Sequence, residues 1–507
     1  MVENNAGRTA VTVPVTAARP SLDLLRTGVP GLDTVLGGGL PALSFNLIAG
    51  GPGSGKTTLA MQMLFANATV ERPGLFLTLL GETSLKLLRY QQQFDFFDTS
   101  RVGSEVHFLN LSEEVLDGDL DRVMTRIAAE VGQLRPGIVV IDSFRALVRP
   151  HVDAQDADLA LEHFVQRLAL HLTTWDVTSF LVGEYQEQEL RNPIFTVADG
   201  ILWLFQAVDR NSVVRKLQLL KMRGMGSMPG LHTVRMTGKG VQVFPRIIER
   251  KEEPRAKRQA RLSTGVPDLD EMMGGGIPAG DAMVLAGPTG SGKTTFATQF
   301  VAAGLRVGEA SVIAVFEEHP EAYLKRVTTL GVDFPSAVKE DKLRIIYLRP
   351  LDLSVDETLE EIRDAVRETG ATRVVIDSIS GFEMALAPTY REDFRESLYR
   401  LVSALTGLGV TIVLTSEILE DSEGFLFTNH AISFITDAII VLRFAEIEGR
   451  LRKVLVVVKI RGSTHSHDFR AYEITPEGVR LGELLPEYDG ISTGHPVRVA
   501  RRAPGGA

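Results

Sequence analysis

The chain consists of one long segment followed by a second copy of it. TGVPGLDTVLGGGLP, which begins at Thr27, returns as TGVPDLDEMMGGGIP, which begins at Thr264. The Gly-rich stretches GGPGSGKTT and GPTGSGKTT lie at the same separation of 237 residues. Three further matched pairs follow in the same order and with nearly the same spacing: Asp142 with Asp377, Asp199 with Asp437, and Lys221 with Lys459. This pattern predicts a tandem duplication of a domain of about 235 residues.

Within each copy, short apolar runs rich in β-branched residues alternate with longer amphipathic stretches. Residues 45–50 read as a strand that leads into a Gly-rich loop, and residues 57–70 read as the helix after it. Residues 137–142, GIVVID, have the composition of a fully buried strand. Strand–helix alternation predicts an α/β fold with a mainly parallel sheet flanked by helices. The hairpin patterns that end each copy are expected to close the sheet.

The repeat and the charge pattern together predict the domain boundaries. The stretch RIIERKEEPRAKRQAR is charged and lacks apolar periodicity, which favours a solvated connector over a nucleic-acid patch. We therefore expect a disordered tail (1–20), a first domain (21–248), a charged linker (249–261), a second domain (262–490) and a C-terminal tail (491–507).

Composition narrows the class of protein. The 507 residues include no cysteine, which excludes disulfides and thiol catalysis and fits a reducing, cytoplasmic location. The formal net charge of -10 argues against nucleic acid as a partner. No apolar run reaches the roughly 18 residues of a membrane span, and the N-terminus lacks the apolar core of a signal peptide. No membrane partner is expected.

The two Gly-rich stretches have the spacing of phosphate-binding loops, G-x4-G-K-T. Glycines let backbone N–H groups turn around phosphate oxygens, the lysine meets the β- and γ-phosphates, and the threonine hydroxyl ligates Mg²⁺. Each loop follows an apolar strand and opens a helix, which favours a nucleotide site over a Gly-rich turn without a ligand. The predicted ATP-binding residues are Gly51, Gly53, Ser54, Gly55, Lys56, Thr57 and Thr58, and Thr289, Gly290, Ser291, Gly292, Lys293, Thr294 and Thr295.

Acidic residues follow the buried strands of both copies. Asp142 and Asp377 end such strands, so they are predicted to hold Mg²⁺ together with Thr57 and Thr294. The alternative for either aspartate is a helix N-cap.

Two adjacent carboxylates, Glu317 and Glu318, follow another strand of the second copy. Neighbouring side chains on an extended backbone point to opposite sides. One can therefore align or deprotonate the attacking group, while the other caps a helix or pairs with a cation. A solvated surface charge is the alternative for each. The matching stretch of the first copy reads Gly81-Glu82, so one carboxylate is missing there.

Each copy also carries a Lys-x-Arg pair, Lys221 with Arg223 and Lys459 with Arg461. On a strand this spacing places both cations on one face. The pairs stand far in sequence from their own phosphate loops, so a neighbouring subunit could use them as arginine fingers. An exposed pair of strand cations is the alternative, and its recurrence at the same position favours the finger.

Together these motifs resemble the KaiC family of clock-type ATPases within the RecA superfamily, over about residues 21–499. The resemblance rests on the TGVPGLD lead-in, the paired phosphate loops, the Glu-Glu dipeptide, the VVIDS strand and the K-x-RG finger. It implies two tandem RecA-like P-loop domains. It also implies a homo-oligomer, a double-ring hexamer with ATP between subunits, in which the first ring is mainly an ATPase and the second autophosphorylates.

The resemblance also assigns roles to individual residues. Glu317 would be the general base of the second domain, with Glu318 beside it, and Glu82 would be the remaining acid of the first. Ser433 falls at the family's phosphoserine. The residues that would touch a neighbour's nucleotide are Lys221, Arg223, Lys459, Arg461, Ser463 and His465.

Three departures from the family pattern change what is expected. Phe434 stands where the family has its phosphothreonine, so a two-site phosphorylation cycle cannot operate in its usual form. Most of the C-terminal peptide that recruits the activating partner KaiA is expected to be absent, although another regulatory protein could bind. Gly81 replaces the first carboxylate of the N-terminal site, which predicts slower turnover there.

Two other classes of function stay open at this point. RecA-type folds also serve DNA-directed motors, against which the acidic balance and the lack of a DNA-binding module argue. A nucleotide-bound assembly scaffold with little turnover is the other alternative. ATPase activity that single-stranded DNA leaves unchanged would disfavour the motor, and absence of any turnover would favour the scaffold.

Overall fold

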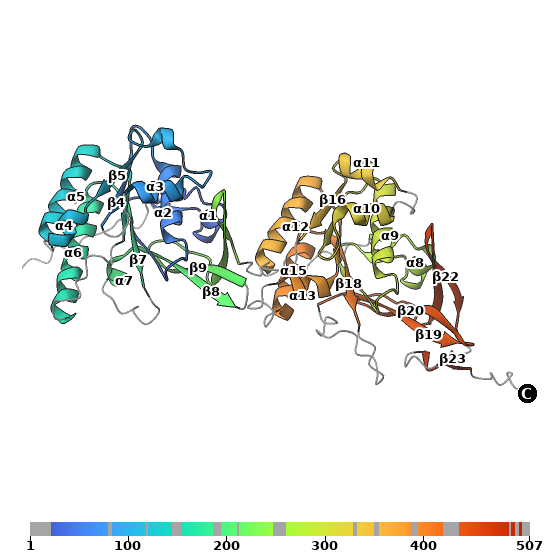
Figure 1. The fold of residues 1–507 in the computed structure, drawn as a ribbon. Helices are drawn as coiled ribbons and strands as arrows, with labels where there is room; N and C mark the ends of the chain where they lie inside the picture. The colour runs from blue at the N-terminus through green and yellow to red at the C-terminus, as the bar shows by residue number, and fades with distance from the viewer. Residues whose placement is uncertain are drawn as a thin grey trace, which may run out of the picture. The chain divides into compact units, whose positions relative to one another are not determined.

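The computed structural model forms two compact units, of which the second comprises Arg246–Ala507 together with Gln206–Arg215 (Figure 1). It describes residues 22–79, 84–117, 120–143, 154–185, 194–209, 212–246, 260–327, 332–348, 354–386, 394–418, 435–485, 488–491 and 496–498. Each unit is an α/β domain with helices on both faces of a sheet, so the predicted tandem duplication of a parallel α/β fold is confirmed.

Within the described residues of the first domain, nine strands form one sheet in the order β11-β10-β9-β8-β3-β7-β6-β4-β5. The section from β8 to β5 is parallel, and β10 and β11 pair antiparallel beyond it. The strands are β3 (Phe45–Gly50), β4 (Gly74–Thr78), β5 (Val106–Asn110), β6 (Ile138–Asp142), β7 (Thr178–Glu184), β8 (Gly200–Asp209), β9 (Ser212–Met222), β10 (Leu231–Thr237) and β11 (Gly240–Phe244). A short pair, β1 (Leu24–Leu25) and β2 (Leu40–Pro41), lies outside this sheet.

The helices of the first domain divide between the two faces of the sheet (Figure 1). They are α1 (Leu32–Val35), α2 (Lys56–Asn67), α3 (Ser84–Gln91), α4 (Ser112–Asp117), α5 (Leu120–Leu134), α6 (Ala154–Thr174) and α7 (Ile194–Val197), with a 3-10 turn at Thr99–Arg101. Side chains alternate along β3, so Leu47 packs with α5 and α6 while Ile48 packs with α1 and α2. Both faces of this strand are therefore buried, as its apolar composition predicts.

The second domain repeats this plan in the strand order β16-β15-β17-β18-β14-β19-β20-β21-β22, counted over its described residues. These strands are β14 (Ala282–Gly287), β15 (Ser311–Val315), β16 (Leu343–Tyr347), β17 (Arg373–Asp377), β18 (Thr411–Glu417), β19 (Ala438–Ile447), β20 (Arg450–Ile460), β21 (Arg470–Thr475) and β22 (Gly478–Leu484). The strands from β19 to β22 form an antiparallel extension, which matches the predicted closing hairpins.

Its helices again cover both faces. One face carries α8 (Pro267–Met272), α9 (Lys293–Arg306), α10 (Pro320–Val327) and α11 (Phe334–Lys339). The other carries α12 (Val355–Thr369), α13 (Ile379–Ala385) and α15 (Phe394–Gly407). None of the helices described in either domain is long and apolar enough to cross a membrane.

Two short pairs of strands touch the expected domain boundaries. Arg261 begins β12 (Arg261–Leu262), which pairs with β13 (Ile277–Pro278). Near the other end, β23 (Tyr488–Asp489) pairs with β24 (Val497–Arg498). Regular structure thus reaches into residues assigned above to the linker and to the C-terminal tail.

The TGVP lead-in packs against the helix that follows the phosphate loop. Thr27 Oγ1 donates to Asp33 Oδ1 at 2.7 Å, and Thr264 Oγ1 donates to Asp270 Oδ1 at 2.6 Å. Gly28 has φ +66, and a Cβ there would lie 2.2 Å from the Ala66 Cβ on α2. The repeated motif is thus explained by packing, because it holds the chain close to the helix that presents the lysine.

Candidate functional site

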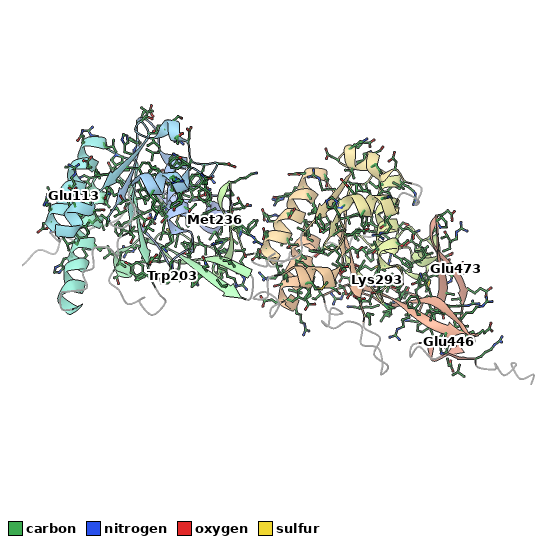
Figure 2. The ribbon with its side chains drawn as sticks, in the orientation of Figure 1. Glu113, Trp203, Met236, Lys293, Glu446 and Glu473 are labelled. Carbon is green, nitrogen blue, oxygen red and sulfur yellow. The ribbon has the colours of Figure 1, made fainter. Side chains whose placement is uncertain are left out.

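The phosphate loops lie at the carboxyl ends of β3 and β14. Each loop turns sharply at a glycine, Gly55 or Gly292, whose φ of 100° is in the left-handed region. A Cβ at Gly55 would lie 2.5 Å from the Met236 Cε, a residue labelled in Figure 2. At Gly51 nothing lies within 4 Å of such a Cβ, so space remains beside the first loop. These features suit a loop that must wrap closely around a ligand.

The loop lysines begin helices α2 and α9 and turn back onto their own loops. Lys56 Nζ donates to the Gly51 carbonyl at 2.7 Å. Lys293, labelled in Figure 2, donates from Nζ to the carbonyls of Gly287 at 2.8 Å and Pro288 at 2.9 Å. Burial lowers the pKa of both lysines, and nearby carboxylates oppose that shift.

The first domain brings its predicted Mg²⁺ ligands together. Thr57 Oγ1 donates to Asp142 Oδ2 at 2.6 Å. In the second domain, Asp377 Oδ1 accepts from Thr415 Oγ1 on β18 at 2.5 Å. The peptide bonds that follow both aspartates, to Ser143 and to Ser378, are cis. Hydroxyl and carboxylate oxygens suit Mg²⁺, so the donor set of the first site fits this ion.

The two adjacent carboxylates of the second domain have different partners. Glu317 Oε1 accepts from Ser378 Oγ at 2.9 Å, next to Asp377 at the end of β17. Glu318 Oε2 forms an ion pair with Arg326 Nη2 on α10 at 2.6 Å. The negative charge of Glu317 also opposes the lowering of the Lys293 pKa. Glu317 therefore belongs to the phosphate-loop edge, and Glu318 has a cation of its own.

Tyr323 ties the segment with these two acids to the phosphate-loop helix. Its hydroxyl lies 2.7 Å from Thr298 Oγ1, and Thr298 Oγ1 lies 2.7 Å from the Thr294 carbonyl, to which it donates. Tyr323 is fully buried, and this burial raises the pKa of its hydroxyl. Sequence reasoning missed this contact, because it joins side chains on two different helices, α9 and α10.

Gly81 and Glu82 lie outside the described residues, but the flanking elements define the length of their segment. Strands β4 and β15 end in register with the two aspartates, at Thr78 and Val315. The next helices begin at Ser84 and Pro320. Residues 79–83 connect the first pair and residues 316–319 the second, so the first connection is one residue longer. Counting from the helix places Gly81 opposite Glu317, whereas counting from the strand places Leu80 there.

The Lys-x-Arg pairs lie near the beginning of the phosphate-loop strands, whereas the phosphate loops lie at the other end of those strands. Arg461 Nη1 contacts Asp437 Oδ1 at 3.3 Å, and the Asp437 backbone N–H donates to the Ala282 carbonyl at 2.8 Å. Ala282 begins β14, whereas Gly287, at its other end, begins the phosphate loop. Five strand steps, about 16 Å, separate the two ends.

The first domain has the same arrangement. Arg223 Nη1 contacts Asp199 Oδ1 at 3.1 Å, and Asp199 Oδ2 accepts from the Phe45 backbone N–H at 3.0 Å, at the start of β3. Lys221 and Lys459 turn toward backbone carbonyls at 2.9 Å (Thr196) and 2.7 Å (Thr436). The matched aspartates thus hold both the arginine and the start of the phosphate-loop strand, a role that the sequence did not reveal.

The remaining predicted residues follow β20 or precede β19. Ser463 Oγ accepts from Arg261 Nη2 at 2.5 Å. The rings of His465 and His467 meet edge to face at 4.4 Å between centroids. Ser433 and Phe434 lie outside the described residues. Among the described side chains, no group of three or more His, Asp or Glu residues is arranged to hold a metal ion.

Two glutamates at the phosphate loops were not singled out from the sequence. Glu184 ends β7 and Glu417 ends β18. Their negative charges oppose the lowering of the Lys56 pKa and the Lys293 pKa, respectively, more strongly than those of the other nearby carboxylates. The signal was present in SFLVGE and TIVLTSE, two apolar strands that both end in glutamate, but neither run shows which strand it would lie beside.

The two domains each match the same family model, described as "ATPase: KaiC", over residues 25–247 and 262–485. Similar proteins cover nearly the whole chain. A "Circadian clock oscillator protein KaiC" of Picosynechococcus sp. is 28% identical over 94% of this chain and 93% of its own length. A "Circadian clock protein KaiC3" of Synechocystis sp. is 28% identical over 95% of this chain and 96% of its own. With both of its domains matched, this chain belongs to the KaiC ATPase family.

Proposed function

We propose that this protein hydrolyses ATP at the interfaces of a homo-oligomer, as a hexamer, and that its second domain phosphorylates Ser433. The domains would divide the work, with slower turnover in the first. The position of the Lys-x-Arg pairs is the observation that carries this proposal, because it supports a nucleotide site that takes its arginine from a neighbouring subunit.

Each domain supplies one half of a nucleotide site at its phosphate-loop edge. Lys56 and Lys293 provide the positive charge for the β- and γ-phosphates of ATP. Thr57 and Asp142 fit Mg²⁺, as do Thr294 and Asp377 by type and position. When bound, this ion would neutralise charge on the same phosphates.

Glu317 is suited to accept a proton from the attacking group. A water or serine oxygen forms a bond to the γ-phosphorus, and the bond from that phosphorus to the bridging oxygen breaks. The electron pair stays on ADP, and the proton passes to Glu317. Glu318 is less suited to this role because Arg326 holds its carboxylate.

The other half of each site would come from a neighbouring subunit. Arg461 lies at the start of β14, about 16 Å of strand from its own phosphate loop. An arginine in that place cannot neutralise its own γ-phosphate. Its position supports a role at a nucleotide bound by the next subunit, and Arg223 has the same relation to β3.

In the sequence, Ser433 lies close to Asp437. It precedes Asp437 by four residues, and Asp437 is bonded to the start of β14. This connection favours transfer of phosphate from the neighbour's ATP rather than from the subunit's own. Phe434 has no hydroxyl, so we expect one phosphate per chain in this segment.

Intact mass and phosphosite mapping, with and without Mg·ATP, test the proposed kinase step. We expect one added phosphate, on Ser433, and a Ser433→Ala chain that stays unmodified yet still hydrolyses ATP. A chain that hydrolyses ATP without modification at Ser433 would contradict the proposed phosphorylation of Ser433. Size measurement with and without Mg·ATP tests the oligomer, and a monomer in both conditions would refute it.

A further inference from the structure

Both phosphate loops have a glutamate beside them. The strand next to the phosphate-loop strand, on the side of the Mg²⁺ aspartate, is β7 in the first sheet and β18 in the second. Glu184 is in register with Gly50, and Glu417 is in register with Gly287. In both strands six buried residues precede an exposed glutamate. The carboxylate is therefore at the open edge of the sheet.

Main-chain hydrogen bonds hold each of these glutamates beside the start of its phosphate loop. The backbone N–H of Tyr185 donates to the Gly50 carbonyl at 3.4 Å, and that of Ile418 donates to the Gly287 carbonyl at 3.2 Å. In the second domain the Thr289 hydroxyl donates to Glu417 Oε1. Pro52 occupies the matching place in the first loop. Because proline has no hydroxyl, the first loop cannot engage Glu184 in this way.

Within the described residues, one strand end beside the first phosphate loop offers a carboxylate that is not part of the expected Mg²⁺ site. Strand β4 ends at Thr78, and β6 ends at Asp142, whose carboxylate already accepts from Thr57. Glu184 ends the strand between β6 and the phosphate-loop strand. It is the carboxylate that stands beside the lysine without being part of the expected Mg²⁺ site.

We propose that Glu184 is the proton acceptor for ATP hydrolysis in the first domain, and so compensates for the glycine at position 81. The inference rests on the ATP hydrolysis proposed above. The oxygen of water forms a bond to the γ-phosphorus as the bond to the bridging oxygen breaks. ADP keeps that electron pair, and the proton moves to Glu184 and then to solvent. In the second domain, Glu317 keeps this role and Glu417 orients the loop through Thr289.

The test uses the full-length chain in which Glu317→Gln and Glu417→Gln remove ATP turnover from the second domain, which we call the silenced background. Adding Glu184→Gln to this background should lower the remaining ATP turnover by about 100-fold, the scale of a lost general base. Glutamine keeps the size and polarity of the side chain but accepts protons poorly. The dissociation constant for a fluorescent ATP analogue should change by less than about 3-fold.

Two matched variants in the same background make the result specific. Glu130→Gln alters a glutamate on α5 that pairs with Arg126, and it should leave turnover unchanged. Glu82→Gln tests the rival acid that the family resemblance assigns to this site, and it should lower turnover far less than Glu184→Gln does. If Glu82→Gln abolishes turnover while Glu184→Gln does not, the inference is wrong. It is equally wrong if Glu184→Gln acts by weakening nucleotide binding.

The outcome also separates this inference from the proposed function. An unsubstituted chain without ATP turnover would contradict the proposed function itself. A chain that hydrolyses ATP, but whose silenced background has no remaining turnover, would leave the proposed function intact and overturn the role of Glu184.

Discussion

The Thr57 hydroxyl donates to the Asp142 carboxylate at 2.6 Å, although 85 residues separate the two in sequence. One lies at the start of α2 and the other at the end of β6. Parallel strands bring them to the same edge of the sheet, so a helix start and a strand end become one group of oxygen donors. This contact brings two of the predicted Mg²⁺ ligands of the first domain together.

Replacement of Thr57 by alanine should weaken Mg·ATP binding at the first site by about tenfold, close to 1.4 kcal/mol, because one oxygen donor is lost. Nucleotide titrations at several Mg²⁺ concentrations would measure this, and the loss should shrink when Mg²⁺ is omitted. Thr125→Ala is the control, since the Thr125 hydroxyl donates to the Asp121 carbonyl within α5. An equal loss without Mg²⁺ would contradict the assignment.

Glu317→Gln should remove most of the total ATP turnover. The variant keeps the shape of the side chain and loses the proton acceptor of the faster site, a change of about 10²-fold or more at that site. Steady-state phosphate release from the full-length chain is the measurement. Total turnover close to that of the unsubstituted chain would show that the first domain is not the slower one.

Arg461→Ala should lower turnover in the second domain by about 10³-fold while the affinity for ATP changes little, because the arginine serves a neighbour's nucleotide. Mixing Arg461→Ala subunits with Glu317→Gln subunits should raise activity above the mean of the two alone. In such mixtures some sites combine an intact Glu317 with an intact Arg461. Arg480→Ala, in an exposed pair with Glu477, is the control. No gain on mixing would favour a site within one subunit.

Tyr323→Phe should destabilise the second domain by about 1–2 kcal/mol, because a buried hydroxyl contact with Thr298 is lost. Denaturant unfolding followed by probes in each domain would measure this, since a two-domain chain need not unfold in one step. A double-mutant cycle with Thr298→Val should give a coupling of about 1 kcal/mol. Additive effects would mean that the hydroxyls do not stabilise one another.

The fold could be predicted largely because its signals are local or repeated. Lys56 and Lys293 sit between an apolar strand and a helix, and that order is visible in the sequence. The parallel sheet followed from the strand–helix alternation, and the structure has it in both domains. The lead-in around Thr27 carries part of the family resemblance, and the structure explains its threonine and aspartate by the hydrogen bond between Thr27 and Asp33.

The parts of the site that could not be predicted depend on which strands are neighbours. Glu184 gains its place beside Lys56 only because β7 lies between β6 and β3. Asp199 contacts both Arg223 and Phe45 at the start of β3, and 154 residues separate Phe45 from Asp199 in the sequence. Sequence spacing gives no measure of such distances. It also gives no partner for Glu318, whose arginine is on the following helix.

A single buried strand spans each domain from one candidate interface to the other. In the second domain, β14 is buried along all six residues, begins at the aspartate that holds Arg461, and ends at the loop that holds Lys293. A packed strand of this kind transmits displacement with little compression. If sites form between subunits as proposed, each subunit is a stiff spacer between two of them. A change of the nucleotide bound at one interface would then strain the site at the other interface.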